Sequence, residues 1–120
     1  MIGEPVELIV RKHFERPSSE KVKMFQGVPT GFVVDAQNGT GALDWRIKPL
    51  DANMRFAGPA MTADAEPRDC LPVQPAIALS RPGDVLVISN GGYDGAAVIG
   101  DNVTAMARNQ GLAAIVTDGL

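Results

Sequence analysis

The sequence contains few of the residues from which several common kinds of site are built. Its 120 residues include one cysteine and one histidine, and aromatic residues make up 5%. The lone cysteine, Cys70, cannot form an internal disulfide, and without a cluster of histidines and cysteines the sequence has no zinc-binding pattern. We interpret Cys70 as a structural residue, because no basic residue is adjacent to it in the sequence to activate the thiol.

Positive charge and long hydrophobic runs are scarce too. Lys and Arg number 11 against 14 Asp and Glu, which gives a net charge of −3. This balance argues against a protein that binds the phosphate backbone of nucleic acid. No segment approaches the roughly 20 apolar residues of a membrane span, and the first residues lack the basic region of a signal peptide. We therefore expect a cytoplasmic protein with no nucleic-acid or membrane partner.

The pattern of residues changes near residue 50, which predicts a mainly helical extension over 1–50 and an α/β core over 51–120 within one domain. In the extension, apolar residues recur at helical intervals over 4–16. A second helix is expected within 17–27, where serines precede the charged and apolar residues and a glycine follows them. Thr30 is expected to be the N-cap of a third helix, which two later glycines would stop.

The core alternates strands with helices in an order typical of a layered α/β domain. The expected elements are a strand with a Gly-Pro interruption (54–64), a helix within 70–84, strand 84–89, helix 102–110 and strand 112–117. The last three form a βαβ unit, whose strands are expected to be parallel and joined by a right-handed crossover. Ligands of such sheets bind at the carboxyl ends of the strands. We therefore expect the site in the loop over 89–101 and the turn at 117–119.

The loop over 89–101, SNGGYDGAAVIGD, is rich in glycine but matches neither common nucleotide motif. Its glycines lack the G-x-G-x-x-G spacing of a dinucleotide site, and no lysine precedes a Ser or Thr as in a P-loop. The step from Gly100 to Asp101 opens a helix, where the backbone N–H groups of Asn102, Val103 and Thr104 can bind a small anion such as a carboxylate. The alternative is that Asp101 simply caps the helix and the glycines form a turn.

Three longer segments carry a resemblance to a known family. They are TGFVVDAQNGTGAL, FAGPAMTADAEPRDCLPVQPAI and RPGDVLVISNGGYDGAAVIGDNVTAMARNQGLAAIVTDG. The most specific landmarks are Gly-Asp-Val-Leu-Val at 83–87, Ala-x-x-Gly-Asp at 97–101 and Val-x-Asp-Gly at 116–119. Residues 30–120 thus resemble the RraA-like family, which includes 4-hydroxy-4-methyl-2-oxoglutarate / 4-carboxy-4-hydroxy-2-oxoadipate aldolases. The resemblance implies a layered β/β/α domain of the swivelling type, incomplete here at its C-terminus, that assembles as a trimer or hexamer.

The resemblance also implies roles for four residues. Gly100 and the backbone amides of Asn102 and Val103 would bind the carboxylate and keto oxygens of a small 2-oxo acid. Asp101 would be catalytic and would hold the water shell of Mg²⁺ or another divalent cation such as Mn²⁺. The family's Arg-Asp pair falls just beyond Leu120. The expectation is therefore that a second polypeptide supplies this pair.

The activity that the resemblance implies is that of a metal-dependent lyase. Such an aldolase cleaves a 4-hydroxy-2-oxo acid and leaves pyruvate as an enolate, whose charge a divalent metal and an arginine stabilise. Oxaloacetate decarboxylase activity uses the same enolate and is a second activity implied. The alternative function is that of a non-catalytic RraA-type regulator that binds a ribonuclease.

Other charged residues have simpler interpretations. Asp64, Glu66 and Asp69 could form a metal-binding cluster, but acidic residues between a strand and a helix more commonly cap and solvate the chain. Asp35 matches an acidic position of the resembling family and is interpreted as a hydrogen-bonding residue on a helix beside the site. His13 is expected on a helix far from the loop and outside the chemistry.

Overall fold

The computed structural model describes Gly3 and residues 8–120 of the chain. Its elements, in chain order, are α1 (Ser19–Met24), α2 (Thr30–Ala36), β1 (Ala60–Asp64), α3 (Val73–Leu79), β2 (Val85–Ser89), α4 (Asp101–Gln110) and β3 (Ala114–Thr117). The expected α/β class is confirmed. None of the described helices is long and apolar enough to span a membrane.

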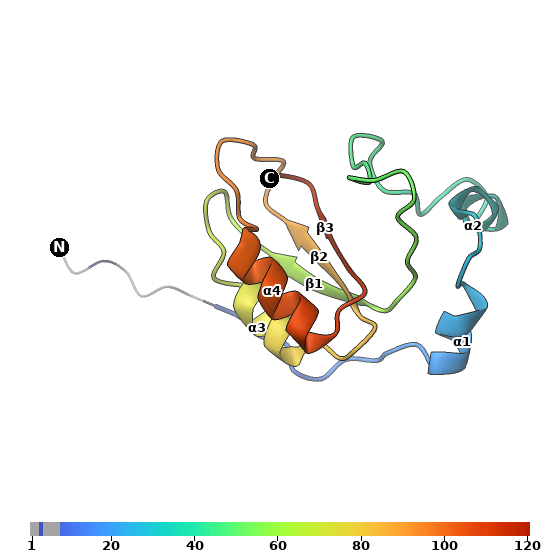
Figure 1. Ribbon diagram of the computed structural model, residues 1–120, viewed down its shortest axis with the longest axis horizontal. Coiled ribbons are helices and arrows are strands. Elements are labelled where there is room, and N and C mark those ends of the chain that lie inside the picture. Colours follow the sequence, from blue (N-terminus) through green and yellow to red (C-terminus); the bar gives the residue numbers. More distant parts are fainter. Residues whose placement is uncertain (1–2, 4–7) are drawn as a thin grey trace.

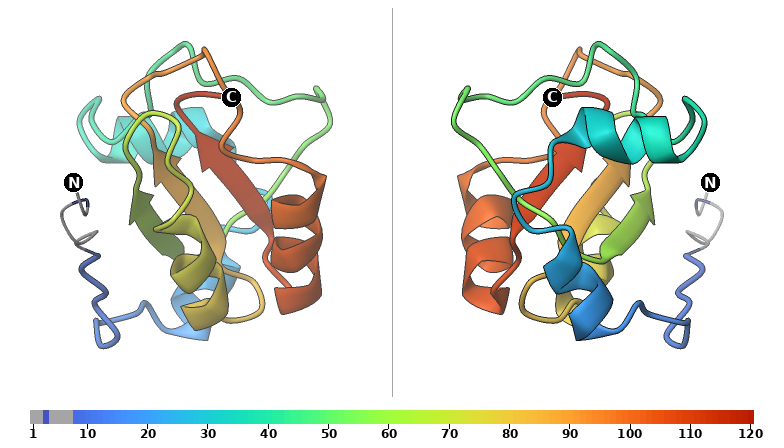
Figure 2. Two further views of the ribbon diagram at one scale, coloured as in Figure 1. Left: turned by 90° about the vertical axis from the view of Figure 1, so that its left-hand side faces the viewer. Right: turned by 90° about the vertical axis from the view of Figure 1, so that its right-hand side faces the viewer.

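The three strands form one parallel sheet in the order β1, β2, β3 (Figure 1). In the central strand, Leu86 lies opposite Met61 of β1 and Ile115 of β3. Figure 2 shows α3 and α4, the helices that connect the strands, on one face of the sheet. The expected βαβ unit is present as β2, α4 and β3. Because all three strands are parallel, their carboxyl ends meet at one edge of the sheet.

The core lies between the two helices and the face of the sheet that they cover. Alternate strand residues enter it, because successive side chains of a strand point to opposite faces. Its buried members are Met61, Ala63, Leu86 and Ile88 from strands, Val73, Ala76, Ile77 and Ala107 from helices, and Ala65 and Val98 from loops. Val98 stands in the loop after β2, so the core extends to the loop in which the site is expected.

The opposite face of the sheet is covered far less. Thr62, Val87 and Val116 form one row across it, in which Thr62 is exposed and both valines are half-buried. Parallel sheets in folded proteins normally have both faces covered. In Figure 1, α1, α2 and the chain up to β1 form an arc that stands apart from the sheet. The arc exposes large apolar side chains, namely Met24, Phe25, Val28, Phe32, Leu43, Trp45, Leu50, Met54 and Phe56.

Two of the three helices expected in the extension are present, with one correction. Ser18 is the N-cap of α1, and its Oγ accepts a hydrogen bond from the Lys21 N–H at 3.3 Å. Thr30 was expected to be an N-cap but is the first residue of α2. Pro29 takes the cap position and makes no side-chain hydrogen bond there.

The helix expected over 4–16 is wrong for residues 8–16, which are irregular, while 4–7 lie outside the described residues. Amphipathic periodicity does not by itself stabilise so short a helix, because most helical stability in proteins comes from packing of the apolar face. Here Ile9 and Phe14 remain exposed. No apolar face is therefore buried to offset the cost of ordering the helix.

The segment 8–16 is instead held at its end by an ion pair. Nη1 of Arg16 donates to both carboxylate oxygens of Asp84, at 2.6 and 2.7 Å. The side chain of Asp84 is 2% exposed and that of Arg16 is 14% exposed. The backbone N–H of Arg81 also donates to Asp84, at 2.8 Å. The pair joins the N-terminal segment to the residue before β2, at the amino ends of the strands.

In the arc, Asp44 and Arg46 form an exposed pair with a measurable consequence. The Arg46 side chain donates to both oxygens of Asp44, through Nε at 2.9 Å and Nη2 at 2.8 Å, and its backbone N–H donates at 2.9 Å. These hydrogen bonds hold the pKa of Asp44 well below its ordinary value. In an NMR titration, we expect Asp44 to stay ionised while ordinary aspartates protonate. Arg46→Gln should raise the pKa of Asp44 toward its ordinary value.

The control for this titration is Arg55→Gln, because the Arg55 side chain donates to backbone carbonyls of the same arc. It should leave the pKa of Asp44 unchanged. Because the pKa is lowered in the folded state, the pair stabilises the fold above the ordinary pKa, and this contribution is lost as the pH falls through the lowered value. An ordinary pKa for Asp44 in the unaltered protein would contradict the pairing.

Candidate functional site

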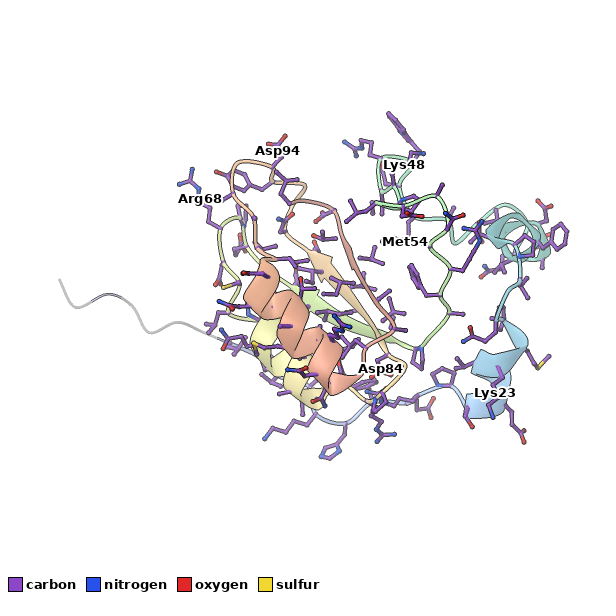
Figure 3. The ribbon with its side chains drawn as sticks, in the orientation of Figure 1. Lys23, Lys48, Met54, Arg68, Asp84 and Asp94 are labelled. Carbon is purple, nitrogen blue, oxygen red and sulfur yellow. The ribbon has the colours of Figure 1, made fainter. Side chains whose placement is uncertain are left out.

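Three loops meet at the carboxyl ends of the strands, 65–72 after β1, 90–100 after β2 and 118–120 after β3. Figure 3 shows Arg68 and Asp94, from the first two of these loops, at the same end of the molecule. This is the edge at which the sequence predicts the site. The ion pair of Asp84 lies at the opposite end of the strands.

Gly100 and Asp101 lie where the second loop enters α4. Gly100 is the N-cap and Asp101 is the first helical residue, so an N-cap role for Asp101 is wrong. Oδ1 of Asp101 accepts the adjacent Asn102 N–H at 2.9 Å. Asp101 is exposed, and a Cβ atom built at Gly100 would meet no described atom within 4 Å outside its chain neighbours. The space beside this step is therefore open to a ligand.

Three backbone amides were expected to bind an anion here, and the structure distinguishes them. The N–H and Oγ1 of Thr104 both donate to the Gly100 carbonyl, at 3.0 and 2.8 Å. The Asn102 N–H is taken by Asp101. The Val103 N–H donates to no residue that the structure describes. Of the three predicted amides, that of Val103 is therefore the unused one, and the helix dipole there favours negative charge.

A shallow depression runs from this end along the exposed side of α4. It is lined by Asp101, Thr104, Ala105, Arg108 and Asn109. A site that buries its ligand is usually concave and largely apolar. This depression beside the Gly100–Asp101 step is open and does not enclose a ligand by itself.

The glycine-rich start of the second loop is occupied by a side chain of the protein itself. Gly91 and Gly92 have φ values of 71° and 67°, a left-handed conformation that glycine adopts without strain. Successive amides in such a turn can cradle an anion. Here the anion is Asp118, whose Oδ1 accepts the Asn90 N–H at 2.7 Å and whose Oδ2 accepts the Gly92 N–H at 3.0 Å. These amides are therefore not available to the phosphates of a nucleotide.

Asn90 supports the same loop from inside. Its side chain is fully buried, and Nδ2 donates to the Tyr93 carbonyl at 3.3 Å. Oδ1 is a buried acceptor with no partner among the described residues. Buried polar atoms are rarely left unpaired. Oδ1 of Asn90 could therefore accept a hydrogen bond from one further donor.

Sequence reasoning missed the pair formed by Arg68 and Tyr93. Nε of Arg68 donates to the Tyr93 hydroxyl at 2.7 Å, and the guanidinium lies 5.4 Å from the centroid of the ring. Arg68 has a φ of 68°, which is uncommon for a residue other than glycine. The pair joins the first two loops over 25 positions of sequence. No local pattern indicates such a contact.

The acidic residues at and after the end of β1 are exposed or make local contacts. Within the described part of the chain, no three His, Cys, Asp or Glu side chains lie close enough to hold a metal ion. Asp69 accepts the Leu71 N–H at 2.8 Å, which is a local turn. Asp64 and Glu66 are exposed.

Three other residues lie outside the site. His13 is exposed in the irregular segment 8–16. Asp35 is exposed on α2, which stands in the arc and not beside α4, so its placement on a helix next to the site is wrong (Figure 1). Cys70 is an exposed free thiol, which corrects its interpretation as a structural residue, because it packs into no core.

Comparison with known proteins adds to this geometry. The family described as "RraA-like: Aldolase/RraA" matches residues 30–120. A protein of Halalkalibacterium halodurans with the provisional name 4-hydroxy-4-methyl-2-oxoglutarate aldolase is 39% identical over 98 residues, which are 82% of this chain and 47% of that relative. The residues that match the family include α4 and the turn after β3.

Two crystal structures have a similar fold. An uncharacterised protein from Pseudomonas syringae pv. tomato superposes with a TM-score of 0.75 at 25% identity, over 94% of this chain and 53% of its own. A structure from Geobacillus kaustophilus titled S-adenosylmethionine: 2-dimethylmenaquinone methyltransferase has a TM-score of 0.66 at 26% identity, over 77% of this chain and 57% of its own. The chain thus spans about half the length of the proteins it matches.

Proposed function

Because this chain belongs to the RraA-like family, we propose that it forms part of a divalent-metal-dependent aldolase that cleaves 4-hydroxy-2-oxo acids to pyruvate. The observation that carries the proposal is the open Gly100–Asp101 step at the start of α4 and at the carboxyl edge of the sheet. It combines an exposed carboxylate with an unused backbone amide, that of Val103, in the first turn of the helix. Oxaloacetate decarboxylation is a second reaction of the same proposed site.

The chain's own residues would bind the common end of these substrates. The Val103 N–H and the positive end of the α4 dipole favour the carboxylate of a 2-oxo acid. The Asn102 N–H joins them when the Asp101 carboxylate turns toward solvent and releases it. The absent side chain of Gly100 lets the substrate approach the backbone closely.

Asp101 would act on protons and on water. In this structure one of its oxygens accepts the Asn102 N–H, and the other can accept a hydrogen bond from a water molecule. Both oxygens can accept from water once the Asn102 N–H binds the substrate. Asp101 would thereby take up or relay the proton that leaves the 4-hydroxyl group during cleavage.

The described residues fit an indirect role toward Mg²⁺ or Mn²⁺. Asp101 offers the hard oxygen donor that these cations prefer, and magnesium usually keeps several waters, to which a carboxylate can hydrogen-bond. The described residues hold no group of three candidate ligands, so direct ligands would come from elsewhere. When bound, the metal would supply a positive charge to the developing enolate oxygen.

We further propose that the Arg-Asp pair of the family is contributed by a second polypeptide segment, in a trimer or hexamer. The less covered face of the sheet supports this, because Val87 and Val116 are only half-buried there while the other face is packed against α3 and α4. The apolar side chains exposed on the arc support it as well. A cytoplasmic location is part of the same proposal.

The test is an assay of pyruvate release by the purified native particle. We expect release from 4-hydroxy-4-methyl-2-oxoglutarate and from oxaloacetate with Mg²⁺, and loss of both activities when EDTA removes the metal. Intact-mass analysis of the same sample should show a second polypeptide. Absence of pyruvate release from a particle of full composition would contradict the proposal and favour a non-catalytic regulator that binds a ribonuclease.

A further inference from the structure

The carboxylate of Asp118 connects two loops that carry the proposed site. It accepts the N–H groups of Asn90 and Gly92, at 2.7 and 3.0 Å, although it lies 28 and 26 positions away in sequence. Hydrogen bonds to an ionised acceptor are stronger than neutral ones. Asp118 therefore anchors the start of the loop over 90–100 to the turn that follows β3.

The end of the same loop is anchored to the same turn. The Val98 N–H donates to the Leu120 carbonyl at 2.7 Å, and the side chain of Val98 is buried in the core. Gly100, the N-cap of α4, follows two positions later. The position of the first turn of α4 thus depends on where residues 118–120 hold the loop.

The turn after β3 packs closely against the loop over 90–100. A Cβ atom at Gly119 would overlap the side-chain amide of Asn90 and would approach the Tyr93 carbonyl oxygen to 2.5 Å. Asn90 is itself buried and bonded to that carbonyl. Only glycine allows Asp118 and Leu120 to reach their partners on either side of it.

We propose that Asp118 is a positioning residue of the proposed site, which fixes the Gly100–Asp101 step by holding the loop over 90–100 against the turn after β3. The effect of Asp118 on substrate binding rests on the proposed function. Its effect on the structure of the loop rests on the hydrogen bonds alone. Asp118 does not touch the substrate in this arrangement, because its two oxygens bond to loop amides.

The structural part is tested by amide exchange and amide chemical shifts in three variants. Asp118→Ala should speed the exchange of the Asn90 and Gly92 amides by about tenfold or more, the loss expected for hydrogen bonds to a charged group. It should also shift the amide resonances of Asn102 and Val103. Asp118→Asn, which keeps one acceptor oxygen, should fall between Asp118→Ala and the unaltered protein.

Asp94→Asn is the matched control, because it removes the same charge from an exposed position of the same loop. It should change neither the exchange of the Asn90 amide nor the resonances of Asn102 and Val103. Unchanged exchange at Asn90 and Gly92 in Asp118→Ala would overturn the inference. Faster exchange there with no shift at Asn102 and Val103 would overturn it too, since Asp118 would then stabilise only its own loop.

A pyruvate titration followed at the Val103 amide separates this inference from the proposed function. In the native particle with Mg²⁺, we expect Asp118→Ala to weaken pyruvate binding about tenfold, as misplacement of a binding group does, and Asp94→Asn to leave it unchanged. If pyruvate does not perturb Val103 even in the unaltered protein, the proposed function fails, while the shifts at Asn102 and Val103 still decide the role of Asp118.

Discussion

Asp101→Asn is expected to slow pyruvate release by about a hundredfold or more, the lower end of the range for a group that transfers a proton in the reaction. Asparagine keeps an Oδ1 that can accept the Asn102 N–H, now 2.9 Å from Asp101. The variant therefore removes the charge and the proton acceptor and leaves the first turn of α4 in place. The measurement is kcat and KM for 4-hydroxy-4-methyl-2-oxoglutarate, with Mg²⁺, in the native particle.

The loss should appear chiefly in kcat, because an interaction made only in the transition state lowers kcat and kcat/KM together. Asp94→Asn, from the loop that leads into α4, is the control for removal of an exposed carboxylate and should keep the unaltered rate. The thermal midpoint of Asp101→Asn should stay near that of the unaltered protein. A normal kcat in this variant would show that Asp101 takes no part in the chemistry.

Arg16→Ala is expected to lower the free energy of unfolding by about 3 kcal/mol or more, the cost usual for breaking a buried ion pair. The Asp84 side chain, 2% exposed, would lose both hydrogen bonds from Arg16 and keep that of the Arg81 N–H. A buried carboxylate without its cation is costly because water cannot replace the lost partner. Urea unfolding of the purified protein measures the change.

Arg11→Ala is the matched control, since Arg11 is an exposed arginine of the same irregular segment. It should change the free energy of unfolding by no more than about 0.5 kcal/mol, as is usual for surface substitutions. Asp84→Asn added to Arg16→Ala should recover part of the lost stability, because the buried group is then neutral. Equal small losses in Arg16→Ala and Arg11→Ala would show that the pair does not stabilise the fold.

These two substitutions act at opposite ends of the strands and should have separable effects. Asp101 lies at the carboxyl edge, where the loops present exposed polar groups. Asp84 lies at the amino edge, where a buried pair ties the N-terminal segment to the sheet. We therefore expect Asp101→Asn to lower the activity and leave the stability unchanged. We expect Arg16→Ala to lower the stability.

Much of the sheet could be predicted from local patterns. The continuous apolar run of β2 and the glycine that ends α4 indicate a strand and a helix end, because both signals depend on neighbouring residues. Gly111 indeed closes α4 with a φ of 84°. The same reasoning overpredicted a helix at 8–16, because periodicity does not reveal whether an apolar face finds a partner.

Part of the candidate site could likewise be predicted from local sequence, and part of it could not. The sequence by itself determined the Gly100–Asp101 step and membership of the RraA-like family, since both are carried by short motifs, each of which is formed by neighbouring residues. Only the tertiary structure decided that Asp118 fills the glycine loop and that Arg68 pairs with Tyr93. The reason is physical: these contacts join residues that the parallel crossovers bring to one edge of the sheet from 25 to 28 positions apart, a distance that no local periodicity encodes.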